Sequence, residues 1–481
     1  MAESTLKEKT SKGLFWGGLS SFLQQLLNAV FGIYLARTLS PDDYGLVGML
    51  AVFSLLALIL QEGGFISALV NRKEIRHEDY NAVFWFNLLV ALACYALLFF
   101  GAPLIAAYFR QPALVKIARW SFLGFVLAGL GTSHRAYLTK KLMVKEMAIV
   151  TMVAVTVSGL VGIFFAWKGY GYWALVIQSL VLAFLTNAGF WLASDWRPSF
   201  RVDFQPVKEM FRFSAKLMLT SALGILNANL VTVILGRYYS AERVGYYTQA
   251  SKWSSMGSTV LSGMVNSVSH PVLAEVVDEK ERQVRVFRKI IRFAAFISFP
   301  AMLGLAFIAP EFILLALKDK WADSILLLQI LCVGGAVLPL CNTCVNLLLS
   351  HGRSTQYMCA NIVLFVLILA AMYLSYPLGV TGMVAAVTAL NLLWLFVWAF
   401  LVRRQIGYTL RQLLADLVPF LGATLAAIGV AYLLTSGIEN RWWLLTAKIL
   451  ITASLYFLTL YLAKSVTLKE SLAFLLKKSQ S

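Results

Sequence analysis

Long apolar runs follow one another along almost the whole of this 481-residue chain, and only short polar segments separate them. The hydrocarbon core of a bilayer is about 30 Å thick, so a helix needs roughly 20 mostly apolar residues to cross it. By that measure, the sequence predicts an all-α integral membrane protein with fourteen transmembrane helices. Their predicted centres are Gln24, Leu56, Ala93, Phe125, Val155, Leu182, Ile225, Met256, Ser298, Gly335, Phe365, Asn391, Leu421 and Thr452.

The composition excludes several classes of protein. Hydrophobic residues make up 60% of the chain and charged residues 13%, whereas soluble domains are about 45–50% apolar and about 25% charged. These values exclude an ordinary soluble enzyme. They also exclude a disordered or nucleic-acid-binding chain, despite the net charge of +18. The excess of Lys and Arg is therefore interpreted first as loop charge that orients a membrane protein.

Most of the Lys and Arg residues fall in the two chain ends and in every second loop. Because positively charged loops stay on the cytosolic side, this bias predicts that both termini are cytosolic. Lys7, Lys9 and Lys12 precede an apolar run that is longer than a signal-peptide core, which predicts an uncleaved first span. Residues 195–213 and 278–292 and the tail after Lys464 mix basic and apolar residues, so we expect them to anchor at anionic lipid headgroups.

A short internal repeat appears when the chain is compared with itself at a shift of 200 residues. Leu35-Ala36-Arg37, Ser40-Pro41-Asp42 and Gly45 align with Leu235-Gly236-Arg237, Ser240-Ala241-Glu242 and Gly245. The match lies between spans one and two and again between spans seven and eight, so both copies run through the membrane in the same direction. This predicts two six-helix lobes related as a parallel repeat, an arrangement that commonly builds transporters.

The repeat and the span positions together predict the organisation of the chain. The expected parts are an N-terminal lobe (1–194), a cytosolic amphipathic linker (195–212), a C-terminal lobe (213–405), two further helices (406–464) and a cytosolic tail (465–481).

Polar residues within the spans gather on four helices. The eighth span has the longest polar stripe, at helical spacing of three and four residues: Thr248, Ser251, Lys252, Ser255, Ser258, Thr259, Ser262, Asn266, Ser269 and His270. Because polar groups are costly in hydrocarbon, they usually face protein or water and mark a substrate pathway. The predicted pathway residues of the four helices are Gln24, Gln25, Asn28, Glu62, Lys216, Asn227, Ser255, Ser262, Lys252 and Asn266.

Each of these residue types has a structural alternative. Ser, Thr and Asn also join helices in membranes. Lys252 lies seven residues past Gly245, so its amine can instead reach the interface. Glu62 can be one member of a buried ion pair. We expect Lys448, in the last span, to reach toward the interface and the four histidines to be interface residues. Cys341 and Cys344 form a single CxxC motif, which we interpret as coincidence.

Several segments resemble one family of membrane proteins. They are Arg37-Thr-Leu-Ser-Pro-Asp-Asp-Tyr-Gly45, Gly171-Tyr-Trp-Ala-Leu-Val176, Trp196-Arg-Pro198, Lys208-Glu-Met-Phe-Arg-Phe-Ser214 and Val244-Gly-Tyr-Tyr247. With them the whole chain resembles bacterial polysaccharide exporters of the multidrug/oligosaccharidyl-lipid/polysaccharide (MOP) flippase superfamily, in the colanic-acid and teichuronic-acid branch. The resemblance implies a two-lobed bundle with a central cavity lined by spans one, two, seven and eight.

The resemblance also implies a function. Such proteins move a lipid-linked oligosaccharide, usually on undecaprenyl diphosphate, from the cytosolic to the periplasmic leaflet of the bacterial inner membrane. On this hypothesis Lys252 and Lys216 hold the diphosphate as point charges. The amides of Gln24, Gln25, Asn28, Asn227 and Asn266 bind the glycan. Spans one and two have no cation comparable with Lys252, which departs from lipid II flippases, whose cavities are richer in arginine.

Two other functions remain open at this stage. One is a drug or metabolite cation antiporter of the same superfamily. The other is a membrane glycosyltransferase or polymerase, for which Asp42 and Asp43 are the candidate acids, although Ser40 and these acids also fit a helix N-terminus.

We expect a transporter rather than an enzyme and no cofactor, with coupling to a proton or sodium gradient through Glu62 left open. The expected partners are the lipid-linked oligosaccharide, membrane lipids, and the polymerase and assembly enzymes of the polysaccharide. Nucleic acid is not among them.

Overall fold

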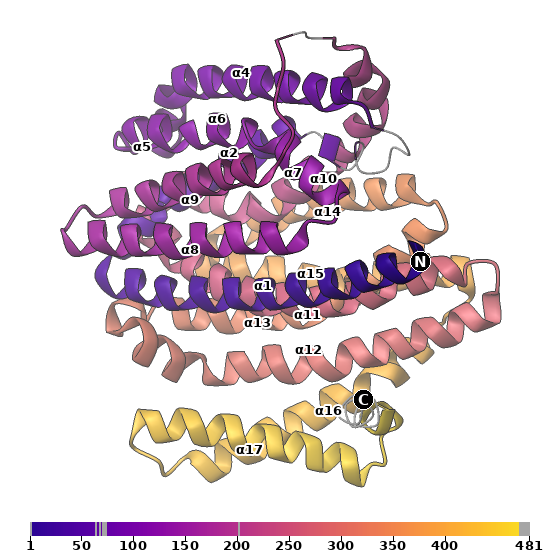
Figure 1. Cartoon of the computed structure of the whole chain (residues 1–481). Coiled ribbons are helices and arrows are strands. Elements are labelled where there is room, and N and C mark those ends of the chain that lie inside the picture. Colours follow the sequence, from indigo (N-terminus) through magenta and orange to yellow (C-terminus); the bar gives the residue numbers. More distant parts are fainter. Residues whose placement is uncertain (1, 63–64, 67–68, 70–74, 201–202, 471–481) are drawn as a thin grey trace. The chain divides into compact units, whose positions relative to one another are not determined.

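The computed structural model describes the backbone of residues 2–62, 65–66, 69, 75–200 and 203–470, and the regular elements in these ranges are helices (Figure 1). The side chains of some helical residues, including Glu62 and Lys216, lie outside the described part. The chain forms two compact units, residues 1–245 (unit 1) and residues 246–481 (unit 2). The lobe boundaries expected from the sequence stay a prediction.

Unit 1 is a bundle of long helices with short connections. Helix α1 packs along α8, α8 pairs with α9, and α10 packs against α2 and α4. The helices of unit 1 are α1 (Ala2–Thr38), α2 (Pro41–Glu62), α4 (His77–Phe109), α5 (Leu114–Ser121), α6 (Leu123–Gly129), α7 (Thr132–Lys140), α8 (Val144–Trp167), α9 (Tyr172–Ala193) and α10 (Gln205–Tyr238).

Unit 2 has the same character. Helix α12 packs against α13, α16 and α17, and α15 packs against both α13 and α14. Helix α11 begins within unit 1 and continues into unit 2. The helices from here on are α11 (Ala241–Glu275), α12 (Lys280–Leu317), α13 (Ser324–Ser350), α14 (Ser354–Ser375), α15 (Gly379–Ile406), α16 (Leu410–Thr435) and α17 (Arg441–Leu462), with short 3₁₀ turns η1 (Asp319–Trp321) and η2 (Tyr376–Leu378).

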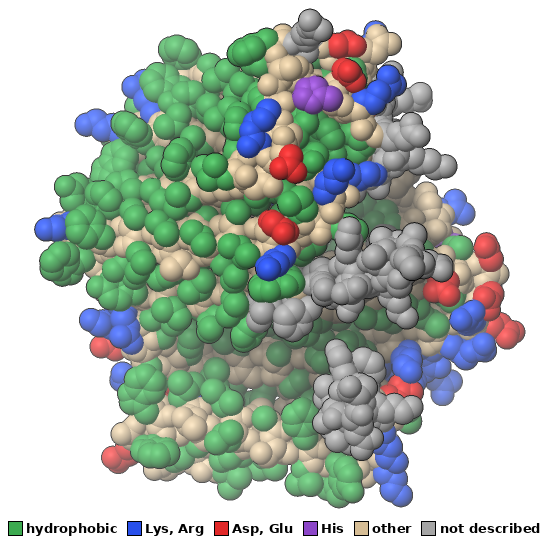
Figure 2. Space-filling model, in the orientation of Figure 1, with side chains coloured by type: hydrophobic (Ala, Val, Ile, Leu, Met, Phe, Trp, Pro, Cys, Tyr) green, Lys and Arg blue, Asp and Glu red, His purple; other side chains and the backbone are tan. Residues whose placement is uncertain are grey.

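Within the described residues, nine helical segments are long and apolar enough to cross a membrane, or ten if the bent passage through α5, α6 and α7 is one span. One of the nine, Ser354–Ile406, combines α14, η2 and α15. Large apolar side chains are exposed along these helices, as Figure 2 shows over α8 and α9. Such continuous apolar surface is typical of helices that face lipid rather than water. The all-helical membrane character predicted from the sequence is therefore confirmed.

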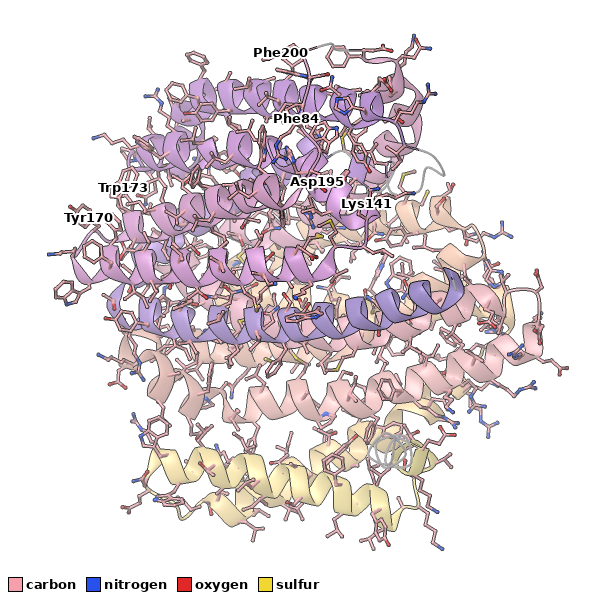
Figure 3. All side chains as sticks on the ribbon, in the orientation of Figure 1. Phe84, Lys141, Tyr170, Trp173, Asp195 and Phe200 are labelled. Atoms are coloured by element: carbon pink, nitrogen blue, oxygen red, sulfur yellow. The ribbon has the colours of Figure 1, made fainter. Side chains whose placement is uncertain are left out.

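The ends of α8 and α9 carry different side chains. Tyr170 and Trp173 lie at the turn that joins the two helices, and Lys141 and Asp195 lie toward their opposite ends (Figure 3). Tyr and Trp are enriched where a helix passes through the membrane–water boundary, and charged residues lie beyond it. The α8–α9 pair thus has the length and the end residues of two membrane crossings.

A buried aromatic cluster joins α4, α7 and α9. His134 of α7 is fully buried, with ring centroids 4.4 Å from Trp191 and 5.0 Å from Trp196. Phe84 of α4 packs against the same rings (Figure 3). The helix packing closes over His134, and its expected position at the membrane interface stays a prediction. Trp196, which lies in the basic segment after α9, is buried in this cluster as well.

The two copies of the repeated motif have the same local structure. Helices α1 and α10 end at Thr38 and Tyr238, and α2 and α11 begin at positions 41 and 241. The hydroxyl of Ser40 accepts a hydrogen bond from the backbone N–H of Asp43 at 3.3 Å. Ser240 accepts the equivalent bond from Arg243 at 3.4 Å. The predicted N-terminal cap at Ser40 is confirmed, because its own N–H donates to the Asp43 carboxylate at 2.9 Å in return.

The repeated glycines bring the starts of α2 and α11 together. A Cβ atom on Gly45 would overlap the carbonyl oxygen of Ala241, and a Cβ on Gly245 would overlap that of Pro41. The two contacts are reciprocal, since each glycine packs on the first residue of the other helix. Only glycine permits this backbone approach. The short repeat seen in the sequence is thus a pair of matching contact points.

Lys448 does not reach toward the interface as expected. Its side chain in α17 is 10% exposed, and its amine donates to Oε1 of Glu311 in α12 at 2.7 Å. The amine also lies 4.5 Å from the centroid of the Phe307 ring. Spacing along one helix could not reveal a partner 137 residues away.

We predict that Lys448→Met lowers the free energy of unfolding by about 3–5 kcal/mol, because it leaves the Glu311 carboxylate buried without its cation. The double variant Lys448→Met/Glu311→Leu should recover most of that loss, since it removes both charges. Denaturant unfolding of the detergent-solubilised protein measures both values. Equal losses in the single and double variants would contradict the buried pair.

Candidate functional site

The candidate site begins with the polar stripe of α11. Helix α11 has 35 residues, more than the bilayer thickness needs. Along the stripe, Ser258 and Ser262 are buried, whereas Ser255 and Thr259 are exposed. The stripe therefore runs along the border between the packed and the exposed faces of the helix. Buried and exposed hydroxyls therefore alternate along the stripe.

Lys252 lies near the start of this stripe. Its side chain is half-buried, and its amine is 5.8 Å from the centroid of the Trp253 ring. Trp253 is itself buried and packs edge-on against Phe312 of α12 at 5.0 Å. Among the residues that the structure describes, no carboxylate lies within 4.0 Å of the Lys252 amine. An ammonium without a carboxylate partner is suited to hold an anionic group of a ligand.

Asn266 has a protein partner. The amide of Asn346 in α13 donates to Oδ1 of Asn266 at 2.9 Å and to Oγ of Ser269 at 2.8 Å. Asn266 therefore joins α11 to α13, which is the helix-joining alternative that the sequence left open. Asn346 was not among the predicted residues. It lies in an otherwise apolar run, so the rule that selected Asn266 applies to it as well.

In unit 1 the predicted residues lie on two helices with different neighbours. Gln24 of α1 donates to the buried Ser20 hydroxyl at 2.8 Å, Gln25 is half-buried and Asn28 is exposed. Asn227 is half-buried on α10. Helix α1 packs along α8, and α10 packs along α2 and α4. Asn28 is therefore exposed and Gln25 half-buried on α1, and the main packing partners of α1 and α10 differ among the described residues.

Three points remain: two predicted residues, metal binding, and one residue that was not predicted. The side chains of Glu62 and Lys216 lie outside the described residues. Within the described part of the chain, no group of three or more His, Cys, Asp or Glu residues could hold a metal ion. Sequence reasoning also missed Gln249 of α11, which is fully buried and whose amide has no hydrogen-bond partner among the described residues.

The chain is similar in sequence to known proteins. Residues 34–326 match the protein family described as "Polysaccharide biosynthesis protein". The lipopolysaccharide biosynthesis protein WzxC of Escherichia coli (strain K12) is 27% identical over 356 residues, which cover 73% of this chain and 71% of that protein. The succinoglycan biosynthesis transport protein ExoT of Rhizobium meliloti (strain 1021) is 26% identical over 351 residues, which cover 73% and 71%.

A solved structure shows the same fold. The lipid II flippase MurJ in an inward closed conformation superimposes with a TM-score of 0.76 and covers 92% of this chain and 97% of its own. The two sequences are 15% identical, so the likeness is one of fold. With the apolar helices, these comparisons identify a multi-pass membrane protein and confirm the resemblance to polysaccharide exporters.

We predict that Asn266→Ala and Asn346→Ala destabilise the protein through the same contact. Hydrogen bonds between membrane helices contribute about 0.6–1.7 kcal/mol, so each single variant should lower the free energy of unfolding by an amount in that range. The double variant should cost little more than either single variant. A double-mutant cycle on the purified protein measures the coupling, and fully additive losses would argue against the shared bond.

Proposed function

Because the chain belongs to the polysaccharide biosynthesis protein family, we propose that it is a flippase for a lipid-linked oligosaccharide. The cargo is carried on undecaprenyl diphosphate and moves from the cytosolic to the periplasmic leaflet of the bacterial inner membrane, for assembly of a surface polysaccharide. The relatives named for lipopolysaccharide biosynthesis and for succinoglycan transport support this proposal. The single observation that carries it is a membrane-length helix, α11, that is polar along its border and holds a lysine without a carboxylate partner.

The proposal includes fourteen membrane crossings with both termini in the cytosol. Helices α1, α10 and α11, of 37, 34 and 35 residues, are long enough to cross but are not among the nine apolar segments found in the described residues. The Gln and Asn residues of α1, the charged residues in the first half of α10 and the polar stripe of α11 account for that. A straight helix of the 53 residues Ser354–Ile406 would be about 80 Å long, so α14 and α15 make two crossings.

The chemistry of the cargo explains why these helices are polar. Sugars exchange hydrogen bonds with water for hydrogen bonds with amides and hydroxyls, which the Gln25, Asn28 and Ser255 side chains offer. The diphosphate needs a cation, and we assign that role to Lys252 together with Lys216. The polyprenyl chain stays in lipid, so the pathway needs polar groups only on the inner faces of the helices. The same positive charge disfavours the alternative of a cation antiporter, because it repels a cationic cargo.

The transferase alternative loses its candidate acids. Both the backbone N–H and the hydroxyl of Ser40 donate to the Asp43 carboxylate, at 2.9 and 2.7 Å. The Asp42 carboxylate accepts a hydrogen bond from the backbone N–H of Glu242 at the start of α11. These two acids therefore cap helices, which supports a transporter over a glycosyltransferase or polymerase.

We predict that Lys252→Ala reduces translocation of a labelled undecaprenyl-diphosphate oligosaccharide in proteoliposomes. Loss of one charge-assisted contact of about 1.5–3 kcal/mol corresponds to roughly a 10- to 150-fold change in the strength of that contact. Lys252→Arg keeps the charge and should retain most of the activity. Lys464→Ala, which removes an exposed lysine beyond α17, is the matched control.

Two outcomes would contradict parts of this proposal. Translocation by Lys252→Ala at the wild-type rate would remove Lys252 from the pathway and leave the flippase intact. Export of a cationic drug by the wild-type protein, with no translocation across a panel of lipid-linked glycans, would overturn the flippase in favour of the antiporter.

We also propose that the starts of α2 and α11 separate and come together again during alternating access, with the reciprocal glycine contacts formed in the closed state. We predict that Gly45→Ala slows translocation, because the added Cβ collides with the Ala241 backbone and destabilises the closed contact. Overpacking costs of about 1–3 kcal/mol correspond to a 5- to 150-fold lower population of the closed state. Gly101→Ala is the control, since Gly101 of α4 has open space around it. Equal rates for wild type and Gly45→Ala would rule out this contact as part of the transport cycle.

A further inference from the structure

A basic pocket of about 250 Å³ lies against the first turns of α12, apart from the polar stripe of α11. Four cationic side chains of α12 line it at spacings of three and four residues, which places them on one face of the helix. The opposite wall comes from the chain beyond α17. The residues of this basic pocket are Arg285, Arg288, Lys289, Arg292, Val466, Thr467 and Glu470. Figure 2 shows charged side chains gathered where α12 begins.

A buried carboxylate holds two of these arginines in place. Asp416 of α16 is fully buried and accepts two hydrogen bonds from Arg288, both at 2.9 Å, and one from Nε of Arg292 at 2.6 Å. The hydroxyl of Tyr408 donates to the same carboxylate at 3.0 Å. One carboxylate thus fixes two guanidinium groups from adjacent turns of α12.

The arginines keep donors for a second anion. A guanidinium group has five N–H donors, and Asp416 uses only part of those of Arg288 and Arg292. Their side chains are still 31% and 41% exposed. A rigid pair of guanidinium groups with remaining donors matches the several oxygens of a phosphate, which Arg binds in a bidentate manner.

The charge of the pocket also favours an anion. Four cationic side chains face two carboxylates, those of Asp416 and Glu470, so the lining keeps an excess positive charge. Glu470 holds Lys289 at 2.8 Å and is half-exposed, which places an exchangeable carboxylate at the site. Glu281 lies 3.9 Å from Arg285 and is 94% exposed, so water largely screens its attraction.

The position of the pocket indicates that its anion is part of a membrane lipid. The apolar part of α12 follows directly after Arg292, and exposed Val466 gives the opposite wall an apolar side. A basic pocket next to the start of an apolar helix is suited to the headgroup of an anionic phospholipid, whose acyl chains continue into lipid. We propose that the basic pocket binds the phosphate group of an anionic phospholipid, with Asp416 as a positioning residue.

The test measures binding of phosphatidylglycerol, with phosphatidylcholine as reference, to the full-length detergent-solubilised protein by native mass spectrometry. Arg288→Ala/Arg292→Ala should weaken phosphatidylglycerol binding on the order of 10- to 100-fold. Arg403→Ala/Arg404→Ala removes the same charge from the exposed end of α15 and should leave binding within about twofold. Equal weakening in both double variants would overturn a specific pocket.

A second set of variants protects the test against misfolding, because the first double variant leaves Asp416 buried without partners. Arg288→Met/Arg292→Met/Asp416→Leu removes the whole ion cluster, and such replacements usually preserve folding. It should bind as weakly as the first double variant. Glu470→Gln frees Lys289 and should strengthen binding. Wild-type binding by the triple variant would overturn the proposal.

The variant Asp416→Asn tests whether the lipid binds because Asp416 positions the two arginines or only because the pocket is positively charged. This variant makes the pocket more positive but releases the two guanidinium groups, so a positioned site predicts weaker binding of phosphatidylglycerol. Stronger binding would overturn the positioning role. In a last arm inorganic phosphate competes with the lipid, and we expect little displacement. Complete displacement by inorganic phosphate at the concentration of the lipid would overturn the assignment to a membrane lipid in favour of a soluble anion.

Discussion

In hydrocarbon, a backbone must satisfy its hydrogen bonds within its own helix, and each polar side chain must find a protein partner or water. The second half of this rule decides how the polar helices of this protein are built. Asn266 meets it through Asn346, Gln24 through Ser20, and Lys448 through Glu311. Other polar side chains, such as Asn28 and Ser255, stay exposed. In the proposed function, these exposed side chains are the ones that a substrate would meet.

The sequence predicted the helices well because their signal is local. Each of the fourteen predicted centres falls within a helix or, for Phe125, within the bent passage of α5 to α7. The apolar length of one segment and the cap at Ser40 depend only on neighbouring residues. Polar contacts between helices depend on residues far apart, such as Lys448 with Glu311 and Asn346 with Asn266. One sequence cannot say which polar residues meet, so joining and pathway residues looked alike.

The internal repeat depends both on a local turn and on a contact between residues that are far apart in the sequence. The sequence shows that Gly45 and Gly245 match. The structure shows why each position needs glycine, because the two copies of the motif contact each other there. Each glycine removes the side chain that would keep the other helix start away. A motif that repeats because its copies touch each other is constrained twice, once by the turn and once by the contact.

Positively charged side chains have more than one role in this chain, and the groups that they contact distinguish these roles. The positive-inside rule counts every Lys and Arg near a membrane helix as an orienting charge. Arg288 and Arg292 add a role that counting cannot reveal, because a fully buried carboxylate fixes their geometry while part of each guanidinium stays exposed. An orienting charge needs only to be near the headgroups, and a lysine such as Lys289 would serve. Burying Asp416 to hold two guanidinium groups has a cost in free energy, because the carboxylate loses its water. An orienting charge does not need that arrangement, whereas a binding site with a fixed geometry does.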